Sequence, residues 1–118
     1  MDFKNLIVYQ KALNVVSALD ENVLANNDLD RSIKDQLRRA SNSIVLNIAE
    51  GSSRLSRADR KNFYVIARGS ALECKAALEI IFRTKKLQYP EIESTLDEVS
   101  KMLFKMISNL HDTAEQKQ

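Results

Sequence analysis

Apolar residues recur every three or four positions in four long segments of the chain, and short polar stretches separate these segments. In the last segment the apolar positions are Ile92, Leu96, Val99, Leu103, Met106 and Leu110. This spacing places one apolar stripe along one face of a helix. The pattern predicts four helices, at about residues 6–25, 31–50, 57–86 and 90–111.

Residues typical of helix ends mark the first two predicted helices. Asn5 and Asp30 precede the two apolar segments and are well suited to cap the helices that follow. Gly51 follows the second segment, where a glycine commonly stops a helix. The second helix is therefore expected to end at about residue 50.

The last two predicted helices carry similar signals. Ser56 and Asp59 resemble a capping box at the start of the third helix. Lys85 and Lys86 lie at its carboxyl end, where positive charge is favourable. Pro90 is expected in the first turn of the fourth helix, because a proline there sacrifices no hydrogen bond.

Chain length and turn residues limit the fold. The 118 residues form one domain, and they include only two glycines and one proline, whereas sheets need frequent turns. Short connections between long amphipathic helices favour antiparallel neighbours. The predicted fold class is all-α, an up-down-up-down four-helix bundle.

The third segment is apolar on almost every side between residues 71 and 82. Either this helix lies at the bundle centre with neighbours covering it, or further copies of the chain cover it, and we favour self-association. Gly69 lies inside the same predicted helix, where a glycine costs about 1 kcal/mol relative to alanine. We therefore expect another helix to approach closely at Gly69.

Basic residues are concentrated in the middle of the chain. Residues 31–68 contain nine basic and three acidic residues, although the whole chain has a net charge of only +2. A stripe on the second helix, continued through the loop onto the third, is a candidate surface for the phosphates of nucleic acid. Within it Tyr64 is a candidate for stacking on a base. The alternative is a solvated face with local ion pairs. The candidate residues are Arg31, Lys34, Arg38, Arg54, Arg57, Arg60, Lys61, Tyr64 and Arg68.

Catalytic chemistry is not indicated. Cys74 is the only cysteine, so it cannot form an intramolecular disulfide, and its position favours an inert core residue. His111 is the only histidine and has no partner in the sequence pattern. We expect no enzyme activity, no cofactor and no metal. The sequence also lacks a signal pattern and a membrane-spanning run, which favours a cytoplasmic protein without a membrane partner.

Three motifs give the chain a family resemblance. They are FKNLIVYQKA at residues 3–12, QLRRASNSIVLNIAEGSSR at 36–54 and NFYVIARGSALE at 62–73. Together they resemble the four-helix-bundle proteins encoded by intervening sequences of bacterial 23S ribosomal RNA genes, the S23 family. Related bundles are accessory subunits of the reverse transcriptases of diversity-generating retroelements. The resemblance implies a bacterial protein that forms a ring-like homopentamer and binds RNA or DNA through basic surfaces.

Five residues correspond to the family's signature: Arg38, Arg39, Asn47, Glu50 and Gly51. We expect Asn47 and Glu50 to close the end of the second helix through polar links to Arg39 or to Arg68. The chain departs from many relatives at Val45 and Leu46, where they place a proline, and at Tyr9, where they place a tryptophan. These departures leave the expected fold unchanged.

Two functional hypotheses follow. The first is a homo-oligomeric protein that binds nucleic acid, in which several copies of a modest basic face act together. The second is an adaptor or accessory subunit that docks a partner enzyme such as a reverse transcriptase.

Overall fold

The structure is a computed structural model that describes the backbone of residues 2–116 and the side chains of residues 2–110. The described chain is entirely helical outside its loops, as predicted. The elements in order are a 3₁₀ turn at Phe3–Asn5, α1 at Ile7–Leu19, a π-helical turn at Asp20–Leu24, α2 at Arg31–Ser53, α3 at Arg57–Lys85 and α4 at Pro90–Gln116. The fourth helix runs past its predicted end at 111, and the interpretation of the His111 side chain lies outside the described residues.

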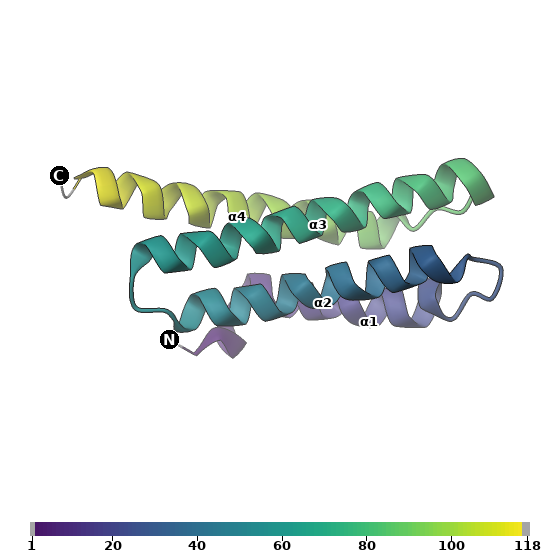
Figure 1. Cartoon of the computed structure of the whole chain (residues 1–118), viewed down its shortest axis with the longest axis horizontal. Helices are drawn as coiled ribbons and strands as arrows, with labels where there is room; N and C mark the ends of the chain where they lie inside the picture. Colours follow the sequence, from purple (N-terminus) through teal and green to yellow (C-terminus); the bar gives the residue numbers. More distant parts are fainter. Residues whose placement is uncertain (1, 117–118) are drawn as a thin grey trace.

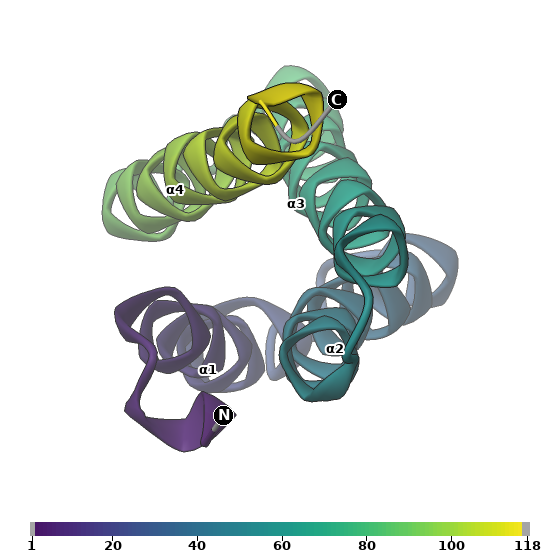
Figure 2. The same ribbon diagram turned by 90° about the vertical axis from the view of Figure 1, so that its left-hand side faces the viewer.

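The four helices lie side by side along one long axis, with overall extents of 53 × 24 × 22 Å. The α1–α2 and α3–α4 loops lie at one end, and the α2–α3 turn lies at the other (Figure 1). Viewed down this axis, α1 and α3 occupy diagonal corners (Figure 2). Each helix packs on its two neighbours, α2 most extensively on α3.

The core runs along the centre of the four helices. Its largest fully buried side chains include Leu19 of α1, Leu37, Ile44 and Ile48 of α2, Leu78 and Ile81 of α3, and Leu96 and Leu103 of α4. Burial of each such side chain contributes about 1.5–3 kcal/mol relative to exposure. The ion pairs between helices, Lys11–Glu98 and Lys75–Asp97, are partly exposed and add little by comparison.

The first helix differs from its prediction at both ends. Asn5 is not its N-cap, because residues 3–5 form a separate 3₁₀ turn and Leu6 precedes the helix with no side-chain cap. At the other end the last turn is π-helical. There the Asn22 side-chain amide donates to the Ala18 carbonyl at 2.9 Å, the acceptor that an α-helical N–H of residue 22 would use.

Gly51 does not stop the second helix, contrary to the prediction. It has no positive φ, and α2 continues to Ser53 before the backbone becomes extended at Arg54. Gly51 is buried against α3, where an added Cβ would lie 2.8 Å from Tyr64 Cε1 and 3.0 Å from Phe63 Cβ. The glycine is therefore required by close helix packing rather than by a helix stop.

The remaining helix ends largely match the sequence signals. Asp30 is the N-cap residue of α2, although its side chain makes no capping hydrogen bond. Ser56 Oγ accepts a hydrogen bond from the Asp59 N–H at 3.1 Å, as expected at the start of α3. Lys86 ends α3 in the left-handed conformation with φ 61°, and α4 begins at Pro90.

One side of α3 remains uncovered in the single chain. This outer face consists of Val65, Ile66, Gly69, Leu72, Ala76 and Ile80, all of them exposed. An added Cβ at Gly69 would meet nothing within 4 Å, so the helix approach predicted there does not occur within the chain. α3 packs on two helices of the same chain, α2 and α4, and neither of them covers this side.

Candidate nucleic-acid interface

The predicted basic stripe is divided among three places in the structure. Arg31, Lys34 and Arg38 lie on α2, and Arg38 lines a hollow shared with α1. Arg54, Arg57, Arg60 and Lys61 gather at the α2–α3 turn. Arg68 lies against α4 and lines a hollow there. Since α2 and α3 separate the two hollows, the structure does not join these residues into one continuous face.

The α2–α3 turn is closed by a hydrogen bond from a basic side chain to the backbone. Arg60 Nε donates to the Arg54 carbonyl oxygen at 2.7 Å, which ties the first turn of α3 to the end of α2. The Arg54 guanidinium lies 4.9 Å from the centroid of the Phe63 ring and 3.5 Å from Glu50 Oε1. Arg57 makes no ion pair with the described residues. Residues 50–61 thus present four cations and two carboxylates at one end of the bundle.

The basic residues of α2 lie away from this turn. Arg38 pairs with Asp35 at 2.7 Å, one turn earlier on the same helix. Arg31 and Lys34 have no ion pair within the described part of the chain. Arg31 begins α2, so the whole length of the helix separates it from the turn.

Tyr64 cannot stack on a base, contrary to the prediction. Its side chain is only 4% exposed, and its hydroxyl lies 2.9 Å from Ser52 Oγ in a buried hydrogen bond. The ring packs over Gly51, so Tyr64 belongs to the core between α2 and α3. The sequence analysis placed Tyr64 in the basic stripe because Lys61 and Arg68 lie on either side of it in the sequence.

The signature residues of α2 form local links that differ from those predicted. Asn47 Nδ2 donates to Ser43 at both its carbonyl oxygen and its hydroxyl, at 2.8 and 3.0 Å. Ser70 Oγ of α3 donates to the same Ser43 hydroxyl at 2.8 Å. Glu50 pairs with Arg54 rather than with Arg39 or Arg68. Asn47 therefore helps to fasten α2 to α3 through two serines.

Arg39 is exposed and borders a hollow between α2 and α3. The other residues that line this hollow are Gln36, Ala40, Ser43, Ser70 and Glu73. Arg39 makes no ion pair with the described side chains. Glu50, the partner predicted for it from the sequence, pairs with Arg54 instead.

Two residues of α4 that the sequence analysis did not single out lie beside Arg68. Phe104 is 57% exposed, and its ring centroid lies 5.2 Å from the Arg68 guanidinium carbon. Lys101 lies one turn earlier and borders the same hollow. The only sequence signal is the segment KMLFK at residues 101–105, where an aromatic residue lies between two lysines.

Cys74 is buried on the inner side of α3. Burial raises the pKa of the Cys74 thiol from 9.0 to about 12, with a smaller contribution from the nearby Glu73 charge, so the thiolate is scarce at neutral pH. No cluster of three or more metal-binding side chains lies within residues 2–110. None of the described helices combines the length and hydrophobicity needed to cross a bilayer.

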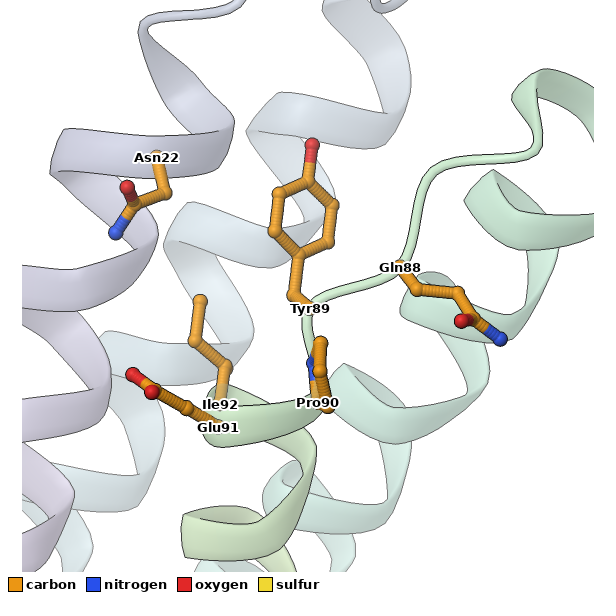
Figure 3. Close-up of a pocket in the computed structure, with 6 residues that line it drawn as sticks. All are labelled: Asn22, Gln88, Tyr89, Pro90, Glu91 and Ile92. Carbon is orange, nitrogen blue, oxygen red and sulfur yellow. The ribbon is translucent and has the colours of Figure 1, made fainter.

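A further hollow of about 360 Å³ lies at the opposite end of the bundle from the basic turn. Figure 3 shows the Tyr89 ring standing between the end of the first helical segment and the start of α4, while Gln88 points away. The lining residues are Asn22, Gln88, Tyr89, Pro90, Glu91 and Ile92, which include a carboxylate and no cation. This hollow is not suited to a polyanion.

The fold and the basic turn define a small all-helical bundle protein. Residues 4–105 match the family described as 23S rRNA-intervening sequence protein, and the chain belongs to this family. The family resemblance predicted from the three motifs is thus confirmed.

The chain is also similar to the crystal structure of a protein with unknown function from the S23 ribosomal protein family of Bacteroides thetaiotaomicron. The TM-score is 0.79 and the sequence identity 30%, over 86% of this chain and 98% of that chain. Among curated proteins none matches.

Proposed function

We propose that this protein is a non-enzymatic, up-down-up-down bundle that assembles into a ring-like homo-oligomer and binds the backbone of RNA or DNA. The observation that carries the proposal is the α2–α3 turn, where a hydrogen bond ties the Arg60 side chain to the Arg54 carbonyl and Arg57 lies between these two residues in the sequence. Closely spaced guanidinium groups are suited to phosphate oxygens.

The positive charge that one copy of the turn carries is too small to bind nucleic acid tightly. Each phosphate that a cation neutralises adds only about 0.7 to 0.9 to the salt-dependence slope. Several copies of the turn on one assembly would act together and raise the effective affinity without any new contact. The proposal therefore joins nucleic-acid binding to self-assembly.

The outer face of α3 supports self-assembly. Val65, Ile66 and Ile80 are each about half exposed, and such a contiguous apolar patch is unusual on a monomer. Ile7 and Leu13 are also exposed, on α1, which lies diagonally across the bundle from α3. Apolar residues on two different sides favour head-to-tail contacts, which form a ring when the rotation from one subunit to the next closes. The family resemblance implies five subunits.

Charge neutralisation at the turn tests the nucleic-acid part of the proposal. Arg57→Gln with Arg60→Gln removes two cations, and the glutamine amide at position 60 keeps a donor for the Arg54 carbonyl. The matched control is Arg83→Gln with Lys85→Gln, which removes the same charge at the other end of α3. The family description refers to 23S rRNA, so a fragment of structured ribosomal RNA is the first probe.

We expect the wild type to bind this RNA with strong salt dependence in filter-binding titrations. The double variant at the turn should lower the slope of log binding constant against log salt concentration by roughly 1.4 to 1.8 for each turn that contacts the RNA. The control double variant should leave this slope near the wild-type value. Equal losses in the two pairs would show that only net charge matters. Binding that does not change with salt would contradict the proposal.

A second candidate function is that of an accessory subunit for an enzyme that acts on nucleic acid. It is favoured by the same outer face, which could dock a different protein. Sedimentation of the purified protein separates the two: a defined oligomer at micromolar concentration favours self-assembly, and a monomer favours a different partner.

A further inference from the structure

The groove between α3 and α4 contains a small hollow of about 310 Å³ whose lining combines cations with an aromatic ring. The lining residues are Arg68, Ser100, Lys101 and Phe104. The Arg68 guanidinium lies over the Phe104 ring, and the ring remains more than half exposed. Phe104 is not among the buried core residues of the single chain.

Arg68 also contains the only buried polar side-chain atom of the described residues that lacks a hydrogen-bond partner, its Nε. A buried donor without a partner carries a desolvation cost that a bound acceptor would relieve. The Lys101 ammonium makes no hydrogen bond or ion pair with the described residues. The hollow therefore offers two positive charges that no carboxylate of the described residues neutralises.

The hollow lies on the same side of α3 as two cations of the basic turn, although it does not extend as far as the turn. Arg57, Lys61 and Arg68 are separated by four and seven residues, which places them on the side of α3 that faces α4. Arg57 and Arg68 are about 16 Å apart along the helix axis at 1.5 Å per residue. This distance corresponds to a few nucleotides of an extended single strand, so one strand could contact both places.

We infer that the hollow receives one unpaired nucleotide, with its base stacked on the exposed side of the Phe104 ring and its phosphate near Lys101. The inference rests on the proposed nucleic-acid binding and adds to it a preference for unpaired strands. Any base can stack on an aromatic ring, and a guanidinium on the ring's other face adds a cation–π contact. An acidic peptide would use the cations but not the ring.

The stacking test uses the absence of tryptophan from the chain. Phe104→Trp introduces a single indole at the proposed stacking position, and Leu46→Trp introduces one at a comparably exposed site on α2, 65% exposed in the wild type. We expect an unstructured RNA oligonucleotide to quench the emission of Phe104→Trp and to leave that of Leu46→Trp nearly unchanged. A blunt RNA duplex of the same length should quench neither.

Affinity measurements on two further variants separate stacking from a general apolar contact. Phe104→Ala and Phe104→Leu should both bind the single strand about 5- to 150-fold more weakly, the loss expected for one stacked base. The inference would be overturned if Phe104→Leu bound the single strand with wild-type affinity. It would also be overturned if the duplex quenched the emission of Phe104→Trp, or if the single strand did not quench it. In these cases salt-dependent binding through Arg57 and Arg60 would still support the proposed function.

Two other outcomes also count against the hollow as a nucleotide site. If Phe104→Ala changes the sedimentation coefficient, the ring belongs to a subunit interface and the inference is overturned. If no oligonucleotide binds at low salt, both the inference and the proposed function are overturned. Because Phe104 is largely exposed, the substitutions should leave the far-UV circular dichroism unchanged.

Discussion

The two glycines of this chain lie inside neighbouring helices, and their surroundings are opposite. Gly51 of α2 is buried where α2 meets α3, and an added methyl group would collide with Tyr64. Gly69 of α3 is exposed, and an added methyl group would meet nothing. Packing within the chain thus explains the first glycine and does not explain the second.

The difference extends to the residues around each glycine. Around Gly51 the contact is closed: Tyr64 and Ser52 are buried and satisfy each other through a hydrogen bond of 2.9 Å. Around Gly69 the outer face is apolar and uncovered. A helix-interior glycine costs about 1 kcal/mol relative to alanine, so its retention at position 69 favours a role in contact with another molecule.

The largest effect is expected from removal of the ring that closes the inner contact. Tyr64→Ala should lower the free energy of unfolding by about 3–5 kcal/mol, because it leaves a cavity and an unpaired Ser52 hydroxyl. Urea unfolding followed by circular dichroism measures this change, at one fixed protein concentration because assembly contributes to stability.

Val65→Ala is the matched control, one residue away on the outer face and 48% exposed. In a dissociated chain it should change the unfolding free energy by at most about 0.5 kcal/mol. A large loss from Val65→Ala that depends on protein concentration would show that the outer face is buried between subunits. A small loss from Tyr64→Ala would contradict the closed inner contact.

Paired glycine substitutions should change stability in opposite directions. Gly51→Ala should cost about 1–3 kcal/mol of unfolding free energy, since the methyl group would lie 2.8 Å from Tyr64 Cε1. Gly69→Ala should add up to about 1 kcal/mol, because alanine favours the helix and meets no neighbour. Thermal and urea unfolding of the two variants side by side provide the measurement.

Sedimentation of the same two variants sharpens the result. If another copy approaches Gly69 closely, Gly69→Ala weakens the assembly even though the dissociated chain becomes more stable. Gly51→Ala should leave the contacts between copies unchanged. A loss of stability in dissociated Gly69→Ala would contradict the open surroundings described here.

Helical periodicity was sufficient to predict an all-helical chain with four long helices, because each apolar stripe covers whole turns of a long helix. The ends of α2 and α3 illustrate the limit of such local signals. Ser56 was correctly identified as a cap because a cap is made by residues three positions apart. Gly51 was misread as a stop because its role depends on Tyr64, which is distant in sequence and reaches Gly51 only after α2 and α3 pack.

The candidate site was less predictable for the same reason. Charge along the sequence indicated the residues of the basic turn, yet it also joined Arg38 and Arg68, which lie on different sides of the α2–α3 pair. The two aromatic residues Tyr64 and Phe104 show the same limitation of the sequence pattern. The aromatic residue within the basic run is buried, and the exposed one lies on a helix that the charge pattern did not indicate.

The smallest expected effect concerns the thiol on the inner side of α3. Burial raises the pKa of Cys74 to about 12 in the folded chain, whereas the unfolded thiol titrates near 9.0. The unfolded state therefore loses its proton first, so the stability that Cys74 contributes is complete below pH 9 and declines as the pH rises from 9 towards 12. Wild type should lose on the order of 1 kcal/mol more than Cys74→Ala between pH 8 and 10.

A thiol on the outer side of the same helix completes the comparison. Ala76→Cys in the Cys74→Ala background places it on the exposed outer face, where it is solvated before and after unfolding. Urea unfolding of the dissociated chain should then show the same pH dependence with and without this thiol. If the dependence appears only at protein concentrations where copies associate, the outer face is desolvated in the assembly, as the inner side of α3 is in the single chain. A wild type whose advantage over Cys74→Ala does not change with pH would contradict the burial of Cys74.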